Sequence, residues 1–251
     1  MNRTGEANSP RHFYLIGHRC NDISRINSAF KSNVNGIECD LWADKNKKWW
    51  ISHDGMLRTE LTEWLSYVKK ADQRFDQQLS LIVFDVKTPL PIGRVRDMIN
   101  DYLPPELPRI YSTAKIAKAH IFQEIVNSLA PNEGVSIDEE DDPHGVAKFF
   151  ADIGASQCWY GNGISVVPLN EPFHQSMQVA VPIRDSKGPF SKVYTWSVHR
   201  KEAIRKYIEE DKVDGIIVGL NNPFTRPVSY ALEIIAANKD VSLAHRSIDL
   251  F

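Results

Sequence analysis

The chain has 251 residues, of which 42% are hydrophobic and 25% are charged, a composition that is ordinary for a globular enzyme. Its formal net charge of −2 gives no global positive field, so a nucleic-acid partner is not expected. Residues 1–12 lack the apolar segment of a secretory leader and no apolar run is long enough to span a bilayer, so we expect a cytoplasmic protein, or a secreted one if a leader has been removed.

Apolar segments typical of strands alternate with segments typical of helices, after a polar and loose stretch over residues 1–12. Strands of one sheet are expected over 13–17, 36–42, 79–87, 109–112, 134–138, 156–160, 192–198 and 214–218. Helices are expected over 24–32, 61–72, 91–103, 115–129, 144–153, 201–210 and 227–237, with Ser24 as the first N-cap. Residues 161–188 are expected to be irregular, and residues 49–53 to form a hairpin-like partner of the second strand.

Strict alternation of strands and helices predicts an α/β fold with a parallel sheet. Eight such units favour closure into a single (β/α)8 TIM barrel, with its active site at the C-terminal mouth of the strands. The length would also suit two small domains, but no GxGxxG motif follows the first strand as in a dinucleotide-binding domain. One domain over residues 1–251 is therefore expected, with residues 239–251 as a polar C-terminal tail.

Ionisable side chains gather at the C-terminal ends of several predicted strands. They are His18 after the first strand, Glu38 and Asp40 in the second, His53 at the end of its hairpin partner, and Asp85 and Lys87 in the third. Residues two apart share a strand face, and Tyr194 and Trp196 share one in a later strand. If these faces line the barrel lumen, the groups converge at the mouth where barrel active sites lie.

Glu38, Asp40 and Asp85 would repel one another and raise one another's pKa unless a cation neutralised them. An all-oxygen cluster favours a hard ion, Mg²⁺ or less readily Ca²⁺, over zinc. Such an ion would bind a phosphoryl oxygen and stabilise the charge that develops there, with Lys87 as a second positive contact. His18 and His53, on opposite sides of that oxygen, would then serve as base and acid. These residues indicate metal-assisted cleavage of a phosphodiester.

The same residues resemble a known family. GHRCND (17–22), IECD (37–40) and SHDG (52–55) are similar to the opening of the glycerophosphodiester phosphodiesterase superfamily. LIVFDVKT (81–88), RDSKGPFSKVYTWSV (184–198) and VDGIIVGLNNP (213–223) resemble its sphingomyelinase D/phospholipase D toxin branch, known from recluse-spider venoms and related bacterial and fungal proteins. The resemblance covers roughly residues 14–223, and SLAHRSIDLF (242–251) resembles a decayed form of that branch's C-terminal plug.

The resemblance implies roles for individual residues. It makes His18 and His53 the catalytic histidines and Glu38, Asp40 and Asp85 the ligands of a metal, usually Mg²⁺. It also implies that the phosphate and headgroup pocket is lined by Lys87, Tyr194, Trp196 and Asn221. In the implied reaction a hydroxyl of the lipid attacks phosphorus and expels an alcohol such as choline, which leaves a cyclic phosphate. Attack by water would give the linear monoester instead.

The sequence also departs from the venom enzymes. The loop GMLRTEL (55–61) has no cysteine where those enzymes carry a disulfide, and His199 follows WSV where they usually have an acidic residue, which leaves the choline preference open. The SHDG motif is also similar to that of ordinary glycerophosphodiesterases. The three cysteines of the chain, Cys20, Cys39 and Cys158, lie far apart and are expected to be free thiols.

Four functions stay open at this point. The first is a metal-dependent phospholipase D that acts on sphingo- or lysophospholipids, works as a monomer and touches a membrane surface; a plugged barrel floor and a hydrophobic rim would favour it. The second is a hydrolase of soluble glycerophosphodiesters that uses water. The third is an aldolase-type barrel in which Lys87 forms a Schiff base. The fourth is a catalytically inactive lipid-binding barrel, which has no need of two histidines beside a metal.

Overall fold

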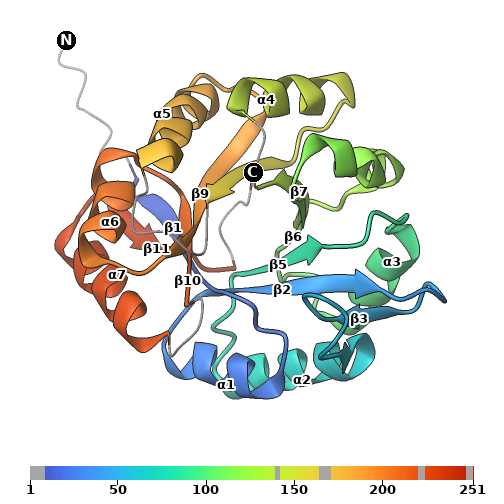
Figure 1. Cartoon of the computed structure of the whole chain (residues 1–251). Coiled ribbons are helices and arrows are strands. Elements are labelled where there is room, and N and C mark those ends of the chain that lie inside the picture. Colours follow the sequence, from blue (N-terminus) through green and yellow to red (C-terminus); the bar gives the residue numbers. More distant parts are fainter. Residues whose placement is uncertain (1–8, 139–141, 164–170, 220–223, 247–250) are drawn as a thin grey trace, which may run out of the picture.

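The structure of the protein, a computed structural model, describes residues 9–138, 142–163, 171–219, 224–246 and 251 (Figure 1). A closed barrel of parallel strands lies at its centre, and the predicted (β/α)8 fold is confirmed. The barrel strands are β1 (Arg11–Gly17), β2 (Gly36–Ala43), β5 (Leu81–Val86), β6 (Arg109–Thr113), β7 (Glu133–Ile137), β8 (Cys158–Gly163), β9 (Phe190–Val198) and β10 (Gly215–Val218). Their order is β1-β10-β9-β8-β7-β6-β5-β2, and β2 pairs with β1 to close the ring.

Helices surround this barrel, as Figure 1 shows. They are α1 (Ile23–Lys31), α2 (Leu61–Arg74), α3 (Gly93–Tyr102), α4 (Pro143–Asp152), α5 (Glu171–Asp185), α6 (Lys201–Arg205) and α7 (Thr225–Ala237), with short helical turns η1 (Ile116–Glu124), η2 (Val126–Ser128) and η3 (Lys206–Glu210). The first helix begins one position earlier than expected because Asp22, rather than Ser24, is the N-cap, and its carboxylate accepts from the backbone N–H of Arg25 at 2.9 Å.

Two hydrophobic cores follow from the two faces of the strands. The larger core fills the layer between the barrel and the helices, where Ile37, Phe84 and Trp64 are fully buried. The smaller one fills the lumen with Tyr14, Ile16, Leu81, Val83, Ile110, Trp159, Tyr194, Ile217 and Ala244. Because both faces of a barrel strand are covered, its sequence can be apolar at nearly every position, as in LIVFDV of β5.

Helix α5 corrects the expectation that residues 161–188 are irregular. Its two prolines are compatible with a helix, since Pro172 falls in the first turn, where no backbone N–H is needed, and Pro182 lies near the end. Met177, Ala180 and Val181 are buried and dock the helix. The prediction failed because prolines were counted as helix breakers without regard to their position.

The helix expected over 115–129 is also corrected, because this segment forms the 3₁₀ turns η1 and η2. Its apolar residues recur every third position, at Ile116, Ala119, Phe122 and Ile125. That spacing places them on one side of a helix with three residues per turn, and the last three are buried.

The second strand has the expected antiparallel partner, followed by a further short strand. These are β3 (Trp49–Ile51), which pairs with β2, and β4 (Thr59–Glu60), which pairs with β3. Strand β3 ends at Ile51, so His53 lies in the following loop rather than at the end of a strand.

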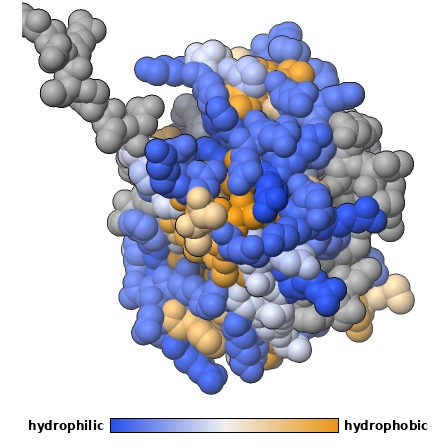
Figure 2. Space-filling model, turned by 90° about the vertical axis from the view of Figure 1, so that its left-hand side faces the viewer, coloured by the Kyte–Doolittle hydropathy of each residue, from blue (hydrophilic) through white to orange (hydrophobic). Residues whose placement is uncertain are grey.

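The surface around the barrel is mostly hydrophilic on the side that Figure 2 presents, with a smaller apolar area near its centre. No helix in the described ranges combines the length and the apolar character needed to cross a membrane. Cys20, Cys39 and Cys158 are buried free thiols, as expected.

The C-terminal tail lies against the floor of the barrel, where the strands begin. A short strand, β11 (Val241–Leu243), pairs in parallel with β1. The carbonyl of Ala244 accepts hydrogen bonds from Asn35 Nδ2 at 2.8 Å and from Ser80 Oγ at 2.9 Å, just before β2 and β5. The ring of Phe251 packs on the lumen core, over Gly134 in β7. Residues 247–250 of the expected plug lie outside the described residues, and the contacts of the others fit a tail that closes the floor.

Truncating this tail contact tests its contribution to stability. We expect Phe251→Ala to lower the free energy of unfolding by about 2 kcal/mol, because a partly buried ring is removed from the lumen core and a cavity is left. For a chain of this size that corresponds to a fall in Tm of about 4–8 °C. As a control, Leu57→Ala truncates a side chain that is 88% exposed and should change the stability by about 0.5 kcal/mol or less. Equal Tm values for the two variants would refute the plug.

Candidate active site at the C-terminal mouth of the barrel

Three carboxylates meet at the mouth because of the register between two neighbouring strands. Glu38 and Asp40 are two residues apart on β2 and point to the same side, and Asp40 lies opposite Asp85 in the β2–β5 pairing. One oxygen from each lies within 4.8 Å of the others. Glu38 is 4% and Asp40 1% exposed, so water screens their mutual repulsion poorly.

Lys87 partly neutralises this cluster. It follows β5 directly, its Nζ lies 3.0 Å from Asp40 Oδ1, and it also forms an ion pair with Asp85. Burial alone would lower the pKa of Lys87, but the charges of Asp85 and Asp40 outweigh burial and raise it. Lys87 is therefore an ammonium at neutral pH.

The surroundings raise the pKa of two of the three carboxyl groups and lower the pKa of the third. Burial raises the pKa of Glu38, and the charges of Asp40 and Asp85 raise it further. Burial and Asp40 together raise the pKa of Asp85 despite Lys87. Burial acts in the same direction on Asp40, but its hydrogen bond with His53, the charge of Lys87 and a hydrogen bond from Asn21 hold its pKa below the usual range.

His18 occupies one side of the carboxylates. It follows β1 directly, and its Nε2 lies 3.8 Å from Glu38 Oε2. Its Nδ1 is 3.1 Å from Ser197 Oγ, which fixes the plane of the ring. Burial, followed by the charge of Arg19, lowers the pKa of His18 to about 3. The imidazole is thus neutral, with Nε2 directed at the cluster.

His53 occupies another side, in the loop after β3. Its Nδ1 donates to Asp40 Oδ1 at 3.1 Å, and its Nε2 accepts from Arg19 Nη2 at 3.0 Å. The side chain is 43% exposed, in contrast to the buried His18. Both imidazoles therefore contact the carboxylate cluster, His18 through Glu38 and His53 through Asp40.

The cluster fits a hard divalent cation. Its three donors are carboxylate oxygens, and the described part of the chain gives one ammonium, Lys87, in ion-pair contact with them. The raised pKa of the buried Glu38 means that its charge lacks sufficient compensation from the protein itself. A divalent ion bound by Glu38, Asp40 and Asp85 would supply that compensation.

Aromatic side chains line the lumen next to the cluster. Tyr194 OH donates to Asp138 Oδ2 at 2.9 Å, and Trp196 Nε1 donates to the carbonyl of Asp138 at 2.5 Å. The Trp196 ring lies 6.4 Å from the His18 ring, centroid to centroid. Burial, then the charge of Asp85, raises the pKa of Asp138 to about 7. Asn221, the remaining predicted pocket residue, lies outside the described residues.

Four groups at this site were missed by the sequence analysis. Arg19 contacts His53, Asn21 donates to Asp40 Oδ2 at 2.6 Å, Ser197 contacts His18, and Asp138 holds Tyr194. Arg19 and Asn21 belong to the GHRCND motif, so their proximity to His18 could have indicated them. Ser197 belongs to the motif at 184–198 and Asp138 to no motif, but only barrel closure brings Ser197 to His18 and Asp138 to Tyr194.

Sequence comparisons find similar proteins over most of the chain. The sequence model of a family described as Sphingomyelinase D/Phospholipase D matches residues 8–230. A dermonecrotic toxin of Loxosceles sabina is 25% identical over 241 residues, which cover 81% of this chain and 87% of the toxin. A dermonecrotic toxin of Loxosceles arizonica is also 25% identical, with 84% and 80% covered.

Solved structures show the same fold at much lower identity. A glycerophosphodiester phosphodiesterase from Parabacteroides distasonis has a TM-score of 0.61 at 14% identity and covers 91% of this chain and 99% of that one. An Oleispira antarctica phosphodiesterase, solved with the product sn-glycerol-3-phosphate, has a TM-score of 0.59 at 11% identity and covers 88% and 96%. At such identities the likeness establishes the barrel fold alone.

Proposed function

Because the chain belongs to the sphingomyelinase D/phospholipase D family, we propose that it releases the headgroup alcohol of a sphingo- or lysophospholipid at the Glu38–Asp40–Asp85 cluster. The protein is an enzyme of the phosphodiesterase type. The observation that carries the proposal is the meeting of three carboxylates, one ammonium and two imidazoles at the barrel mouth.

The proposed cofactor is Mg²⁺, held by Glu38, Asp40 and Asp85. Carboxylate oxygens suit it, and Ca²⁺ is the less favoured alternative. When bound, the ion supplies Lewis-acid stabilisation of the charge on a phosphoryl oxygen. Lys87 adds a fixed positive charge beside the same position, since its two carboxylate partners hold it at the edge of the cluster.

His18 is proposed as the base and His53 as the acid. A hydroxyl of the lipid attacks phosphorus and passes its proton to His18 Nε2, which is neutral in its buried position. A new P–O bond closes the cyclic phosphate while the bond to the headgroup oxygen breaks. That oxygen takes the Nε2 proton of the imidazolium form of His53, in which Nδ1–H still donates to Asp40 and orients the ring. Arg19, which contacts this nitrogen, would turn toward the phosphate.

The headgroup is proposed to lie against the partly buried Trp196, with the fully buried Tyr194 supporting this pocket through its contact with Asp138. An indole face attracts a quaternary ammonium, and the hydrogen bond from Trp196 Nε1 to the carbonyl of Asp138 fixes the ring in place. Asn221 is proposed for the same pocket on the strength of the family motif. Choline- or ethanolamine-type headgroups fit these groups, although His199 stands where the venom enzymes usually have an acidic residue.

Membrane contact is proposed for the loop after His53. Met56 is 83% and Leu57 88% exposed, and they lie directly beyond the catalytic loop, next to Arg58. Two large apolar side chains at an exposed tip suit insertion into a lipid surface, with Arg58 beside anionic headgroups. This placement would bring the barrel mouth to the membrane in a protein that works as a monomer.

Charged residues at this tip should uncouple surface binding from chemistry. We expect the double variant Met56→Asp, Leu57→Asp to lower turnover of sphingomyelin in vesicles by about tenfold or more, because charged side chains do not enter the interface. Turnover of a short-chain monomeric lysophosphatidylcholine should stay within about twofold. The control variant Val179→Asp replaces an apolar residue that is exposed elsewhere, on α5. Equal losses on vesicles and monomers would argue against a membrane role.

The proposed function is tested by measuring choline release from three phosphodiesters. With Mg²⁺, we expect release from sphingomyelin or lysophosphatidylcholine and none after EDTA treatment. Release from glycerophosphocholine alone would favour the alternative, a soluble glycerophosphodiesterase. The Schiff-base alternative is disfavoured because the pKa of Lys87 is raised by Asp85 and Asp40, which keeps the amine protonated and non-nucleophilic.

A further inference from the structure

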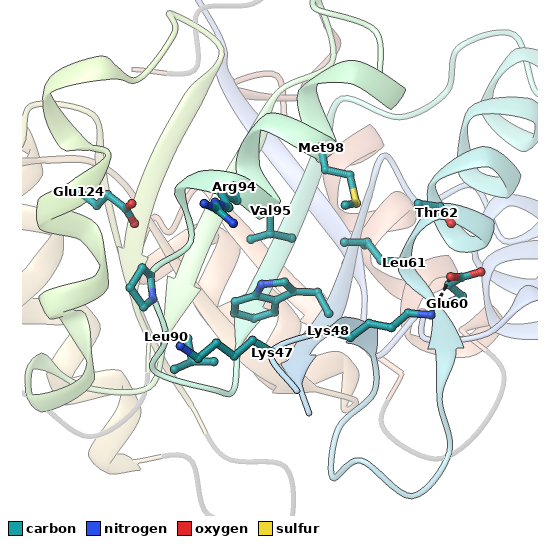
Figure 3. Close-up of a pocket in the computed structure, with 12 residues that line it drawn as sticks. Lys47, Lys48, Glu60, Leu61, Thr62, Leu90, Arg94, Val95, Met98 and Glu124 are labelled. Atoms are coloured by element: carbon teal, nitrogen blue, oxygen red, sulfur yellow. Dashed lines mark hydrogen bonds and ion pairs between the residues drawn. The ribbon is translucent and has the colours of Figure 1, made fainter. Parts of the chain in front are cut away.

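A second cavity lies on the outside of the barrel wall and shares no residue with the active site. It is a groove of about 590 Å³ between β3, the start of α2 and the start of α3 (Figure 3). This volume falls within the range of small-molecule pockets. The groove is therefore large enough for a ligand of its own.

Apolar side chains form one part of the groove. Val95 and Leu61 are buried beneath it, Met98 is 38% exposed, and the half-buried Trp49 and Leu90 continue the surface. In Figure 3, Leu61, Val95 and Met98 face the same space from the two helices. The apolar character of this part suits a hydrocarbon chain better than a polar ligand.

Charged side chains lie at the other part of the groove, and two of its cations, Lys47 and Arg94, are available to a ligand. Lys48 is paired with Glu60 at 2.9 Å, and Glu124 accepts from the backbone N–H of Gly93 at 3.1 Å. The side chains of Lys47 and Arg94 have no hydrogen bond or ion pair with any residue in the described ranges, and both are exposed. In Figure 3 Lys47 runs beside Leu90, Arg94 reaches in from α3 on the side of Glu124, and Met98 lies toward Thr62.

From this separation of charge and apolar surface we infer a binding site for a single-chain lipid with a phosphomonoester head. Lys47 and Arg94 bind the phosphate, and the chain lies along Leu61, Val95 and Met98. Arginine offers a planar pair of donors and lysine a point charge, and both are common phosphate ligands. Binding needs neither a metal nor catalysis, so the inference does not depend on the proposed reaction.

The test is calorimetric titration of the metal-free protein with decyl phosphate below its aggregation concentration. We expect one binding event that weakens about tenfold or more in the variant Lys47→Ala, Arg94→Ala, since two charge-assisted contacts are lost. Hexyl phosphate should bind more weakly than decyl phosphate, and inorganic phosphate more weakly still, because a shorter alkyl chain makes fewer apolar contacts. The control variant Lys45→Ala, Lys187→Ala removes two exposed cations outside the groove and should bind as the wild type does.

The inference is overturned if decyl phosphate does not bind, if both double variants bind it with the same affinity, or if the affinity does not depend on chain length. Choline release from monomeric lysophosphatidylcholine should stay within about twofold in Lys47→Ala, Arg94→Ala; a parallel loss would mean that the groove belongs to the active site. A wild type that binds decyl phosphate but releases no choline would refute the proposed function and leave this site intact.

Discussion

His18→Asn should lower kcat for lysophosphatidylcholine by about 10³-fold, the usual contribution of a positioned proton-transfer group. The amide can replace the contact of Nδ1 with Ser197 but cannot take up a proton at the position of Nε2. KM should change little, because the proposed role of His18 is in proton transfer and not in holding the headgroup. The measurement is steady-state choline release at saturating Mg²⁺.

His120→Asn is the matched control, since His120 is exposed on η1 and has no part in the proposed chemistry. Its kcat should equal that of the wild type. The Mg²⁺-dependent rise in Tm should persist in His18→Asn, which separates lost chemistry from lost metal binding. A His18→Asn enzyme that retains a tenth or more of the wild-type kcat would exclude His18 as the base.

Glu38→Gln should abolish detectable turnover and yet stabilise the metal-free protein. Glu38 is buried beside Asp40 and Asp85. Removing one of three mutually repelling charges lowers the electrostatic repulsion in the folded state. The sign follows from its raised pKa: the ionised form, present above the ordinary pKa of a glutamate, is less stable in the folded state than in the unfolded chain. We expect a gain of about 1–2 kcal/mol, or about 2–8 °C in Tm.

Addition of Mg²⁺ should raise the Tm of the wild type and leave Glu38→Gln unchanged, because a carboxylate ligand is missing. Glu133→Gln is the matched control at the opposite end of the barrel. Its carboxylate is paired with Arg96 at 2.6 Å, and although burial acts to raise its pKa, that pairing lowers it. Loss of this charge should therefore destabilise the protein. If both variants moved Tm in the same direction, crowding of charge at the mouth would not explain the effect.

Apolar patterning was enough to predict the barrel. The run LIVFDV in β5 is apolar at nearly every position because both faces of this barrel strand are covered, and eight predicted strands alternate with helical segments. Helix α5 was missed because the prolines of residues 161–188 were counted as loop-forming residues, and residues 115–129 were expected to form one helix where the structure has the 3₁₀ turns η1 and η2. The division into one domain over residues 1–251 stays a prediction.

The site was predictable where its residues lie at the ends of predicted strands. Strand alternation places Glu38 with Asp40, and the C-terminal ends of other predicted strands bring His18, His53 and Asp85 to the same mouth. The contacts of Ser197 with His18 and of Asp138 with Tyr194 span 179 and 56 residues, so only the closed barrel reveals them. The external groove was not predictable either, because Lys47 and Arg94 come from separate elements on its two sides.

Phosphorus NMR of sphingomyelin and lysophosphatidylcholine turnover tests the central claim most directly. With Mg²⁺, the account predicts that the diester signal of at least one lipid is replaced by that of a cyclic phosphate, and that EDTA or His18→Asn prevents the change. A linear monoester in its place would retain the site but make water the nucleophile. Spectra in which no lipid phosphodiester is consumed, while Mg²⁺ is bound, would contradict the account.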